Sequence, residues 1–200
     1  HIGHYIGLAH FGMEALSTHK LPVYCSSRMG EFLANNGPWS QLVHRENISL
    51  QTLLPEKKIH LTRRISITAF PVPHRDEFSD VLGFKISGKT KCLLYIPDID
   101  NWEAWERSII EEIEKVDFAV IDGSFFSFRE LPDRDIAQIG HPTISMSMKA
   151  LRKAIETKKP IIAFTHLNHT NPVIDSDGKA RKEVERRGFK VMADGAEFFL

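Results

Sequence analysis

Four apolar, strand-like runs of this sequence each lead directly to a histidine or an aspartate. ISITAFPVP is followed by His74, CLLYIP by Asp98 and IIAFT by His166, while FAVI ends at Asp122. In layered α/β proteins the carboxyl ends of the strands line one edge, so side chains held there can converge on one point. Imidazole and carboxylate groups together suit zinc, iron or manganese, and an aspartate can bridge two metal ions. The pattern predicts a metal site.

The remaining histidines differ in their placement. His1 and His4 have the spacing i, i+3 just before a predicted helix, which puts both on one side of the chain and makes them candidate ligands. Four others have no such placement, and we expect them to be surface or structural residues: His10, His19, His44 and His60.

Each of these residues also has an ordinary structural explanation. An aspartate at the end of a strand commonly forms a turn or caps a helix, which applies to Asp98 and to Asp122 taken singly. A lone histidine at a strand end is often only a hydrogen-bonded polar residue. Four such strand ends together with the His1 and His4 pair favour the metal site.

Composition indicates an ordinary globular protein. The 200 residues are 42% apolar and 26% charged, which excludes a disordered or collagen-like chain. Lys and Arg number 26, as do Asp and Glu, so no basic surplus indicates a nucleic-acid or anionic-membrane partner. No apolar run approaches the roughly 20 residues of a membrane span, and the first residues do not resemble a signal peptide.

The two cysteines favour a reducing compartment. Cys25 and Cys92 are far apart in the sequence, and each has apolar neighbours. We therefore expect buried free thiols and a cytoplasmic protein.

Hydrophobic periodicity divides a single predicted domain, residues 1–200, into α/β elements. Before residue 48 we expect a helix over 5–18, a strand over 21–25 and a helix over 27–35. Between 48 and 96 the runs are strand-like, and afterwards strands alternate with helices. The later elements are helices over 101–116, 142–157 and 179–187, with Asp100 and Glu103 as a capping pair for the first, and strands over 118–122, 161–164 and 189–193. Antiparallel strands followed by βα units predict layered α/β architecture with a mixed sheet.

One motif is misleading. Residues 83–90, GFKISGKT, match the phosphate-binding pattern G-x-x-x-x-G-K-[ST]. Such a loop must follow a strand and open a helix, but KCLLYI and then Pro97 come directly after Thr90. We expect a hairpin turn near Gly88 and no nucleotide site.

Several of these segments carry a family resemblance. HIGHYIGL looks like the end of the metallo-β-lactamase superfamily signature His-x-His-x-Asp-His. FLANNGPWSQLV, VPHRDEFSDVLGF, YIPDID, VIDGSFF, THLNHTNPVID and GFKVMADG, in this order, resemble the pyrroloquinoline quinone biosynthesis B proteins and their relatives within that superfamily. The resemblance spans nearly the whole chain and implies the αβ/βα sandwich fold with mixed sheets.

The resemblance also implies a ligand set. It assigns as metal ligands His1, His4, His74, Asp98 and His166, with Asp98 as the bridging carboxylate. It places His169 beside the ligands and likens His141 to a histidine that related phosphodiesterases use as a proton donor. His141 precedes Pro142 at a predicted helix start, so a helix-capping role is the alternative.

The sequence departs from the family pattern in two ways. It begins at His1, so the first histidine of the signature and the preceding strands are absent, and the chain looks like a fragment of a longer protein. Gly3 stands where the signature has aspartate. We therefore expect one or two divalent metal ions, with unequal occupancy as an alternative to a full pair.

These features predict an enzyme, a metal-dependent hydrolase acting on an ester, phosphodiester or similar bond of a small-molecule substrate. The metal, zinc or else iron or manganese, lowers the pKa of water and polarises a carbonyl or phosphoryl oxygen. Asp98 would orient the attacking hydroxide, Asp122 would fix a histidine tautomer, and His141 or His169 would protonate the leaving group. The alternatives are an iron-dependent oxygenase-type role in quinone cofactor biosynthesis and a non-catalytic metal or cofactor carrier.

Overall fold

The structure, a computed structural model, describes residues 1–131, 140–158 and 160–200. By their contacts these residues form two compact units, which we describe separately. The first unit comprises His1–Lys57 and Arg75–Val81, and the second comprises Lys58–His74 and Leu82–Leu200. The prediction of one domain over 1–200 is not tested by this division and stays a prediction.

The first unit is a small α/β cluster. Its elements are α1 (Ile2–Tyr5), the 3-10 helix η1 (Ile6–Phe11), β1 (Leu21–Cys25), α2 (Ser27–Asn35), α3 (Trp39–His44) and β2 (Ile48–Thr52). β1 and β2 pair in parallel. The core of this unit consists of Leu33, Trp39, Leu42 and Ile48, and the Tyr5 ring meets Trp39 edge-on at 5.4 Å.

The helix expected over 5–18 is wrong in its extent. The helical segment begins at Ile2, tightens to 3-10 geometry at Ile6 and ends at Phe11. Gly12 follows with extended backbone, and the chain then turns. Glycine at positions 3, 7 and 12 lowers the helix propensity of this stretch, which explains its early end. The helix expected over 27–35 is confirmed, and its first turn is capped by the Ser26 hydroxyl.

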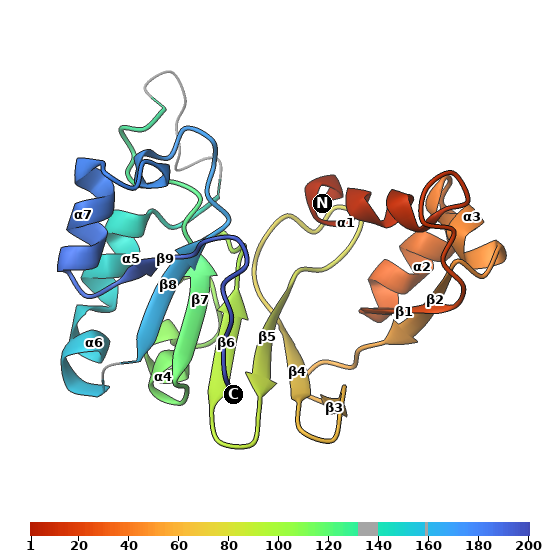
Figure 1. The fold of residues 1–200 in the computed structure, drawn as a ribbon, viewed down its shortest axis with the longest axis horizontal. Coiled ribbons are helices and arrows are strands. Elements are labelled where there is room, and N and C mark those ends of the chain that lie inside the picture. Colours follow the sequence, from red (N-terminus) through yellow and green to blue (C-terminus); the bar gives the residue numbers. More distant parts are fainter. Residues whose placement is uncertain (132–139, 159) are drawn as a thin grey trace. The chain divides into compact units, whose positions relative to one another are not determined.

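The second unit contains a mixed sheet, as predicted (Figure 1). This sheet has seven strands. Its strands, in the order in which they pair, are β3 (Lys58–His60), β4 (Ser66–Pro71), β5 (Leu82–Ser87), β6 (Cys92–Ile96), β7 (Phe118–Asp122), β8 (Ile161–Thr165) and β9 (Lys190–Val191). β3 to β6 pair antiparallel, whereas β6 to β9 pair in parallel.

Alternate side chains of the central strands face opposite layers. One set, which includes Ile96, Ile121 and Phe164, is fully buried. The helices of this unit are α4 (Ile109–Glu114), α5 (Ile144–Ala150), α6 (Arg152–Lys158), the 3-10 helix η3 (Pro172–Ile174) and α7 (Lys179–Arg186). In Figure 1, α4 to α7 gather to one side of β6 to β9, while the C-terminal segment crosses in front of the strands.

The opposite set of side chains forms a smaller apolar cluster. Leu93, Val120 and Ala163 are its buried members, and Phe198 and Leu200 of the C-terminal segment pack against them. The Phe198 ring meets the Phe118 ring edge-on at 5.2 Å. This face of the sheet is therefore covered by irregular chain rather than by the helices.

Two predicted helices of this unit differ from the observed ones. The helix expected over 101–116 begins only at Ile109, after the cap Ser108, because tertiary hydrogen bonds hold the preceding residues in bends. The Trp102 indole donates to the Ser147 hydroxyl at 2.9 Å, and the Trp105 indole donates to the Pro71 carbonyl at 3.1 Å. The helix expected over 142–157 is two helices, α5 and α6.

The remaining predicted elements can also be compared with the structure. The strand expected over 189–193 is shorter in the structure, where β9 comprises only Lys190–Val191. The helix expected over 179–187 is confirmed as α7. The hairpin expected near Gly88 is confirmed, since β5 and β6 pair antiparallel and the Gly88 amide donates to the Lys91 carbonyl at 2.9 Å.

Within the described residues neither cysteine is in a disulfide; Cys25 is buried, and Cys92 is partly exposed. No helix in this part of the chain has the length and hydropathy that crossing a membrane requires.

Candidate metal centre

Four strands of the second unit deliver the candidate residues to one edge of the sheet. β6, β7 and β8 are parallel, and β4 runs in the same direction because two antiparallel pairings separate it from β6. His74 follows β4, Asp98 follows β6, Asp122 is the last residue of β7, and His166 comes directly after β8. The convergence predicted from the four apolar runs is therefore present in the fold.

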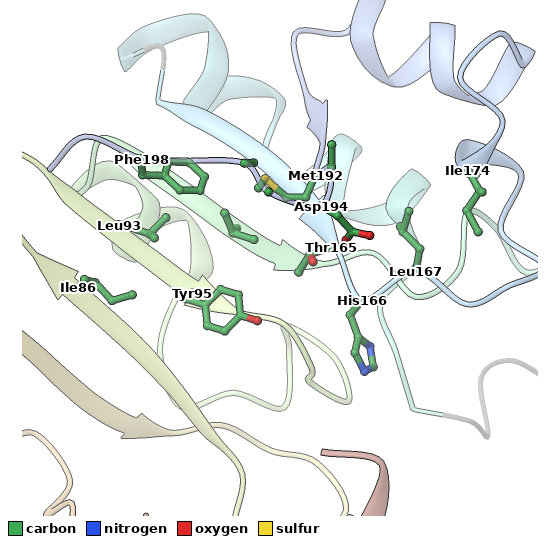
Figure 2. A pocket seen from close by; sticks show the side chains of 14 residues that line it. Ile86, Leu93, Tyr95, Thr165, His166, Leu167, Ile174, Met192, Asp194 and Phe198 are labelled. Atoms are coloured by element: carbon green, nitrogen blue, oxygen red, sulfur yellow. The ribbon is translucent and has the colours of Figure 1, made fainter. Parts of the chain in front are cut away.

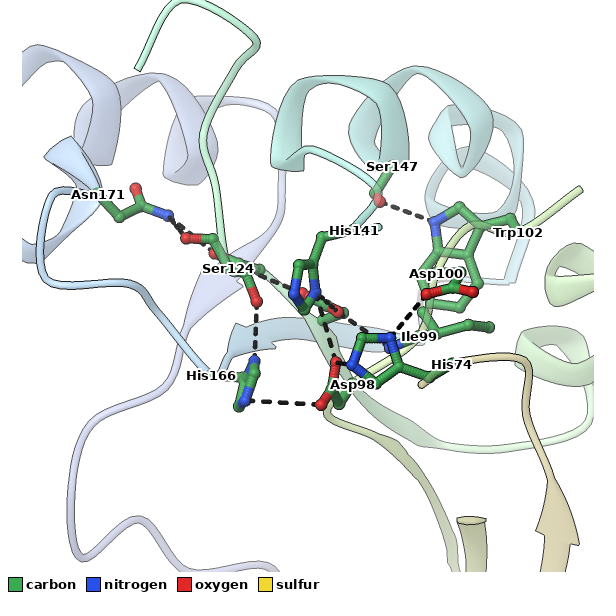
Figure 3. Close-up of polar contacts among 12 residues, drawn as sticks. His74, Asp98, Ile99, Asp100, Trp102, Ser124, His141, Ser147, His166 and Asn171 are labelled. Carbon is green, nitrogen blue, oxygen red and sulfur yellow. Dashed lines mark hydrogen bonds and ion pairs between the residues drawn. The ribbon is translucent and has the colours of Figure 1, made fainter. Parts of the chain in front are cut away.

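His74 lies between two carboxylates (Figure 3). Its Nε2 is 3.1 Å from Asp98 Oδ1, and its Nδ1 is 2.8 Å from Asp100 Oδ1. The His74 and Asp98 side chains are each only 1% exposed, whereas that of Asp100 is 40% exposed. Asp98 is thus a buried carboxylate, and Asp100 lies at the rim of the site.

This arrangement demands a positive charge. Ionised carboxylates can only accept hydrogen bonds, so each nitrogen of His74 must carry a proton or another cation that faces its carboxylate. Burial acts to lower the pKa of His74, but the hydrogen bonds and charges of Asp98 and Asp100 outweigh it and raise the pKa above its usual value. A divalent ion on Nε2 would serve the same electrostatic purpose as that second proton.

Asp122 is fully buried and holds His141. Its Oδ2 lies 2.8 Å from His141 Nδ1 and accepts from the Ile99 amide at 3.1 Å, while its Oδ1 accepts from the Ser124 amide at 2.8 Å. The same His141 nitrogen is 3.5 Å from Asp98 Oδ1. Because Asp122 can only accept when ionised, the His141 Nδ1 carries a proton, which fixes the tautomer of the neutral ring.

His166 is oriented through the loop after β7. Its Nδ1 is 2.8 Å from the Ser124 hydroxyl, and its Nε2 is 3.9 Å from Asp98 Oδ2. The buried Asn171 amide fixes this loop by donating to the carbonyls of Gly123 at 2.8 Å and Ser124 at 3.1 Å. His166 itself has a φ of 60°, in the left-handed region that residues other than glycine seldom adopt.

The three imidazoles of His74, His141 and His166 therefore surround the buried carboxylate of Asp98 (Figure 3). One ligand atom from each of Asp98, Asp122, His141 and His166 lies within 4.8 Å of the others. Two imidazole nitrogens and two carboxylates are ligands that suit zinc, iron or manganese. The residues present thus fit a divalent metal ion.

Not every predicted residue belongs to this group. His169 is exposed in the turn after β8 and is not among the described side chains that converge on Asp98. His1 and His4 belong to the first unit, where their ring centroids are 4.6 Å apart. Their role as ligands stays a prediction. The four histidines expected at the surface, His10, His19, His44 and His60, are all exposed.

Sequence reasoning missed two residues that hold the histidines in place. Asp100 was expected to cap a helix, but it accepts from His74 instead, and Ser108 caps α4. The Ser124 hydroxyl contacts His166 Nδ1 at 2.8 Å, a role that its position in the sequence does not indicate. The two-residue spacing from Asp98 to Asp100 is a signal that could have identified the first; no local signal identifies the second. His141 does not cap a helix either, because Thr143 is the N-cap of α5.

A mixed sheet whose strand ends gather histidines and aspartates around a buried carboxylate defines the class as a metallo-β-lactamase fold. The family profile described as "Beta-lactamase superfamily domain" matches residues 1–167. The chain therefore belongs to the metallo-β-lactamase superfamily, and the predicted α/β fold with a mixed sheet is confirmed.

Two curated relatives share one name. The chain is 26% identical over 148 residues to "Coenzyme PQQ synthesis protein B" of Gluconobacter oxydans, a match that covers 67% of this chain and 48% of the relative. It is 24% identical over 217 residues to the protein of the same name from Nitrosococcus oceani, covering 94% of this chain and 69% of the relative. The chain thus spans about half the length of the first relative and about two thirds of the second.

Solved structures agree on the fold. The structure described as Zn(2+)-bound PqqB from Methylobacterium extorquens matches with a TM-score of 0.73 at 22% identity, covering 90% of this chain and 63% of that chain. Unliganded yeast PDE1 matches with a TM-score of 0.58 at 12% identity, covering 88% of this chain and 59% of that chain. At these identities the likeness establishes the fold, while activity has to be argued from the site.

Proposed function

We propose that this chain is the metal-binding part of a hydrolase, with zinc as the first candidate ion and His74, Asp98 and His166 as ligands. The observation that carries the proposal is the buried His74 imidazole with a carboxylate at each nitrogen, facing two further imidazoles across Asp98. His1 and His4 remain predicted additional ligands. The Zn(2+)-bound state of the PqqB structure supports zinc as the first ion to test.

The described residues have distinct parts in the proposed reaction. A divalent ion at this site supplies Lewis acidity toward a carbonyl or phosphoryl oxygen and makes water more acidic. Asp100 orients His74 so that Nε2 faces Asp98, and Ser124 orients His166 so that its Nε2 faces the same carboxylate. Buried Asp98 is the acceptor that can hold and align the attacking water.

His141 is the proposed proton donor. Its Nδ1 proton is held by Asp122 at 2.8 Å, which leaves Nε2 to take a proton and deliver it to a leaving group. The ring is 11% exposed and lies edge-on to Phe125 at 5.7 Å, so it is fixed and largely screened from bulk water. His169, the other proton donor considered, is exposed and has no such support.

The test combines metal content with turnover. We would measure zinc, iron and manganese per chain in protein purified without added metal, and then assay the zinc-loaded protein on p-nitrophenyl acetate, bis(p-nitrophenyl) phosphate and a chromogenic β-lactam. We expect His74→Ala to lose metal and activity together. Retained metal with full turnover in His74→Ala would overturn the ligand assignment.

The His141 assignment is tested separately, with the metal in place. His141→Gln should keep bound metal but reduce turnover by about 10²- to 10⁴-fold, the usual range for a general acid or base. The matched control is His169→Gln, which we expect to leave turnover unchanged. Equal losses in the two variants would remove His141 from this role.

The names of the relatives favour a role in the synthesis of the coenzyme PQQ. The second candidate that we propose is such a role with iron-dependent, oxygenase-type chemistry. Histidine and carboxylate ligands also suit Fe(II). Oxygen consumption that depends on added Fe(II), without hydrolysis of the substrate panel, would support this candidate instead. Bound metal with neither activity would support a metal or cofactor carrier. A cytoplasmic location stays a prediction.

A further inference from the structure

A groove of about 490 Å³ lies among the helices of the second unit. It is bounded by the end of α5, one face of α6, the last turn of α7 and the chain that follows α7. Its lining includes Met148, Lys149, Arg152, Ile155, Arg186 and Phe189. The lining contains none of the described side chains that converge on Asp98, so the groove is separate from the candidate metal centre.

The floor of the groove is apolar and is fixed to the sheet. Met148 and Phe189 are each only 2% exposed, and the Phe189 ring stacks on that of Phe164 in β8 at 5.6 Å. Phe164 points to the side of the sheet opposite to Leu93 and Tyr95, which Figure 2 shows. The groove therefore belongs to the helical layer and does not depend on the sheet face that the C-terminal segment covers.

The two walls of the groove meet at Gly188. A Cβ added at this position would lie 3.2 Å from Ile155 Cγ2, and the φ of 86° is one that glycine adopts readily. The chain can therefore leave α7 in close contact with α6. Ile155 itself is only partly buried, so its side chain offers apolar surface within the groove.

The rim of the groove is positively charged. Four exposed cations line it: Lys149, Arg152, Arg186 and Arg187. Arg152 pairs with Glu156 at 2.8 Å, and Arg187 pairs with Glu183 at 2.6 Å. Lys149 and Arg186 form no ion pair with any residue that the structure describes. One cation on each wall is therefore available to an anion from outside.

These cations are part of a separation of charge along the chain. Residues 149–159 and 179–190 contain 11 of the 26 Lys and Arg residues but only 3 of the 26 Asp and Glu residues. The formal net charge of the chain is zero, so the remaining residues carry a matching negative excess. A balanced total thus conceals a basic region, and such a region attracts anionic partners.

We propose that this groove binds an acidic segment of a partner protein, with one carboxylate at Lys149, another at Arg186 and an apolar side chain against Ile155. Lysine and arginine form charge-assisted hydrogen bonds with carboxylates. The inference does not involve the metal centre and is independent of the proposed function.

The apolar floor favours a peptide over other polyanions. Proteins that bind single-stranded nucleic acids stack the bases on aromatic side chains, but the Phe189 ring is buried against Phe164. Surfaces that bind anionic membranes insert apolar side chains into the lipid, whereas Met148 and Phe189 lie at the bottom of a groove. A peptide can supply both carboxylates and a side chain that reaches such a floor.

The test is a titration of the isotopically labelled protein with capped pentapeptides, followed by amide chemical shifts in nuclear magnetic resonance. The peptide EEFEE should shift amides in 148–156 and 186–189, which border the groove. It should bind about two- to thirtyfold more tightly than QQFQQ, as expected of two exposed ion pairs. It should also bind about three- to tenfold more tightly than EEAEE, which corresponds to partial burial of the phenyl ring.

Two double variants assign the binding to the groove. Lys149→Gln combined with Arg186→Gln should reduce the affinity for EEFEE to that for QQFQQ. The same variant should also weaken the dependence of binding on salt. The matched control is Arg63→Gln combined with Arg64→Gln, which removes the same charge from exposed residues of the same unit outside the groove. It should leave the affinity unchanged.

Several results would overturn the proposal. Equal losses in the two double variants would mean that only the net charge attracts the peptide, and an absence of shifts at the groove would remove it as the site. Tighter binding of oligothymidylate or of phosphatidylserine vesicles than of EEFEE at the same residues would assign the groove to nucleic acid or membrane. Shifts at the groove on raising the protein concentration alone would assign it to a second copy of the chain.

Discussion

Asp100 should control metal affinity without binding the metal. Its Oδ1 accepts from His74 Nδ1 at 2.8 Å, and this contact both orients the ring and makes Nε2 more basic. Removal of such a partner typically costs 10- to 100-fold in metal affinity. The Asp100 side chain is 40% exposed, so solvent screens its charge, and we expect Asp100→Asn to fall near the lower limit. The predicted loss is therefore about tenfold, or about 1.4 kcal/mol.

The assay is competition for zinc with a chromophoric chelator, monitored at equilibrium. Asp177→Asn is the matched control, because Asp177 is an exposed aspartate of the same unit outside the site. Circular dichroism and thermal unfolding of the metal-free proteins show whether both variants are folded. Unchanged zinc affinity in a folded Asp100→Asn variant would refute the reasoning, because it would mean that the orientation of His74 does not depend on this carboxylate.

Three further predictions follow from the same site. Gly140→Ala should weaken zinc binding, because an added Cβ would lie 2.7 Å from Asp100 Oδ1 and the φ of 75° is unfavourable for alanine; zinc competition and thermal unfolding measure both effects. Ser124→Ala should lower zinc affinity by less than tenfold, because it removes a neutral partner of His166, which the same competition assay measures. Because folding raises the pKa of His74, protonation of its ring stabilises the metal-free fold. This contribution is complete at pH values below the pKa of an unfolded histidine, about 6.5, and is lost as the pH rises through the pKa of the folded state. Zinc requires the deprotonated nitrogen, so the rise in melting temperature on adding zinc should be larger at about pH 8 than at about pH 5.5.

Each of these predictions has a contrary outcome. Zinc affinity in Gly140→Ala equal to that of the unmodified protein would show that the loop shifts without disturbing Asp100. A loss in Ser124→Ala greater than that in Asp100→Asn would reverse the ranking of charged and neutral partners. A zinc-induced rise in melting temperature that is the same at both pH values would contradict proton release from His74.

The main elements of the site could be predicted because apolar strands that end in polar residues carry a local signal. His74, Asp98, Asp122 and His166 follow such runs, and parallel register then brings them together. The residues that orient them could not be predicted in the same way. Ser124 meets His166 across 42 positions of the sequence, and no periodicity reports a contact of that kind.

The predicted start of the helix over 101–116 was wrong for a related reason. The stretch from Asn101 to Ser108 has the spacing of a helix, but hydrogen bonds from Trp102 and Trp105 to distant partners hold it in bends. Local propensity is weak and is overridden when side chains have better tertiary partners. Because the helix begins at Ile109 and is capped by Ser108, Asp100 is too far from its start to cap it.

The buried Asp122 carboxylate joins three separate segments of the chain. It accepts from the Ile99 amide after β6 and from the Ser124 amide after β7, and it faces His141 Nδ1 just before α5. The same group therefore closes the polar end of the sheet and fixes a histidine of the site. Selection for a stable fold and selection for the geometry of the site consequently act on one side chain, so neither property can drift at this position without the other.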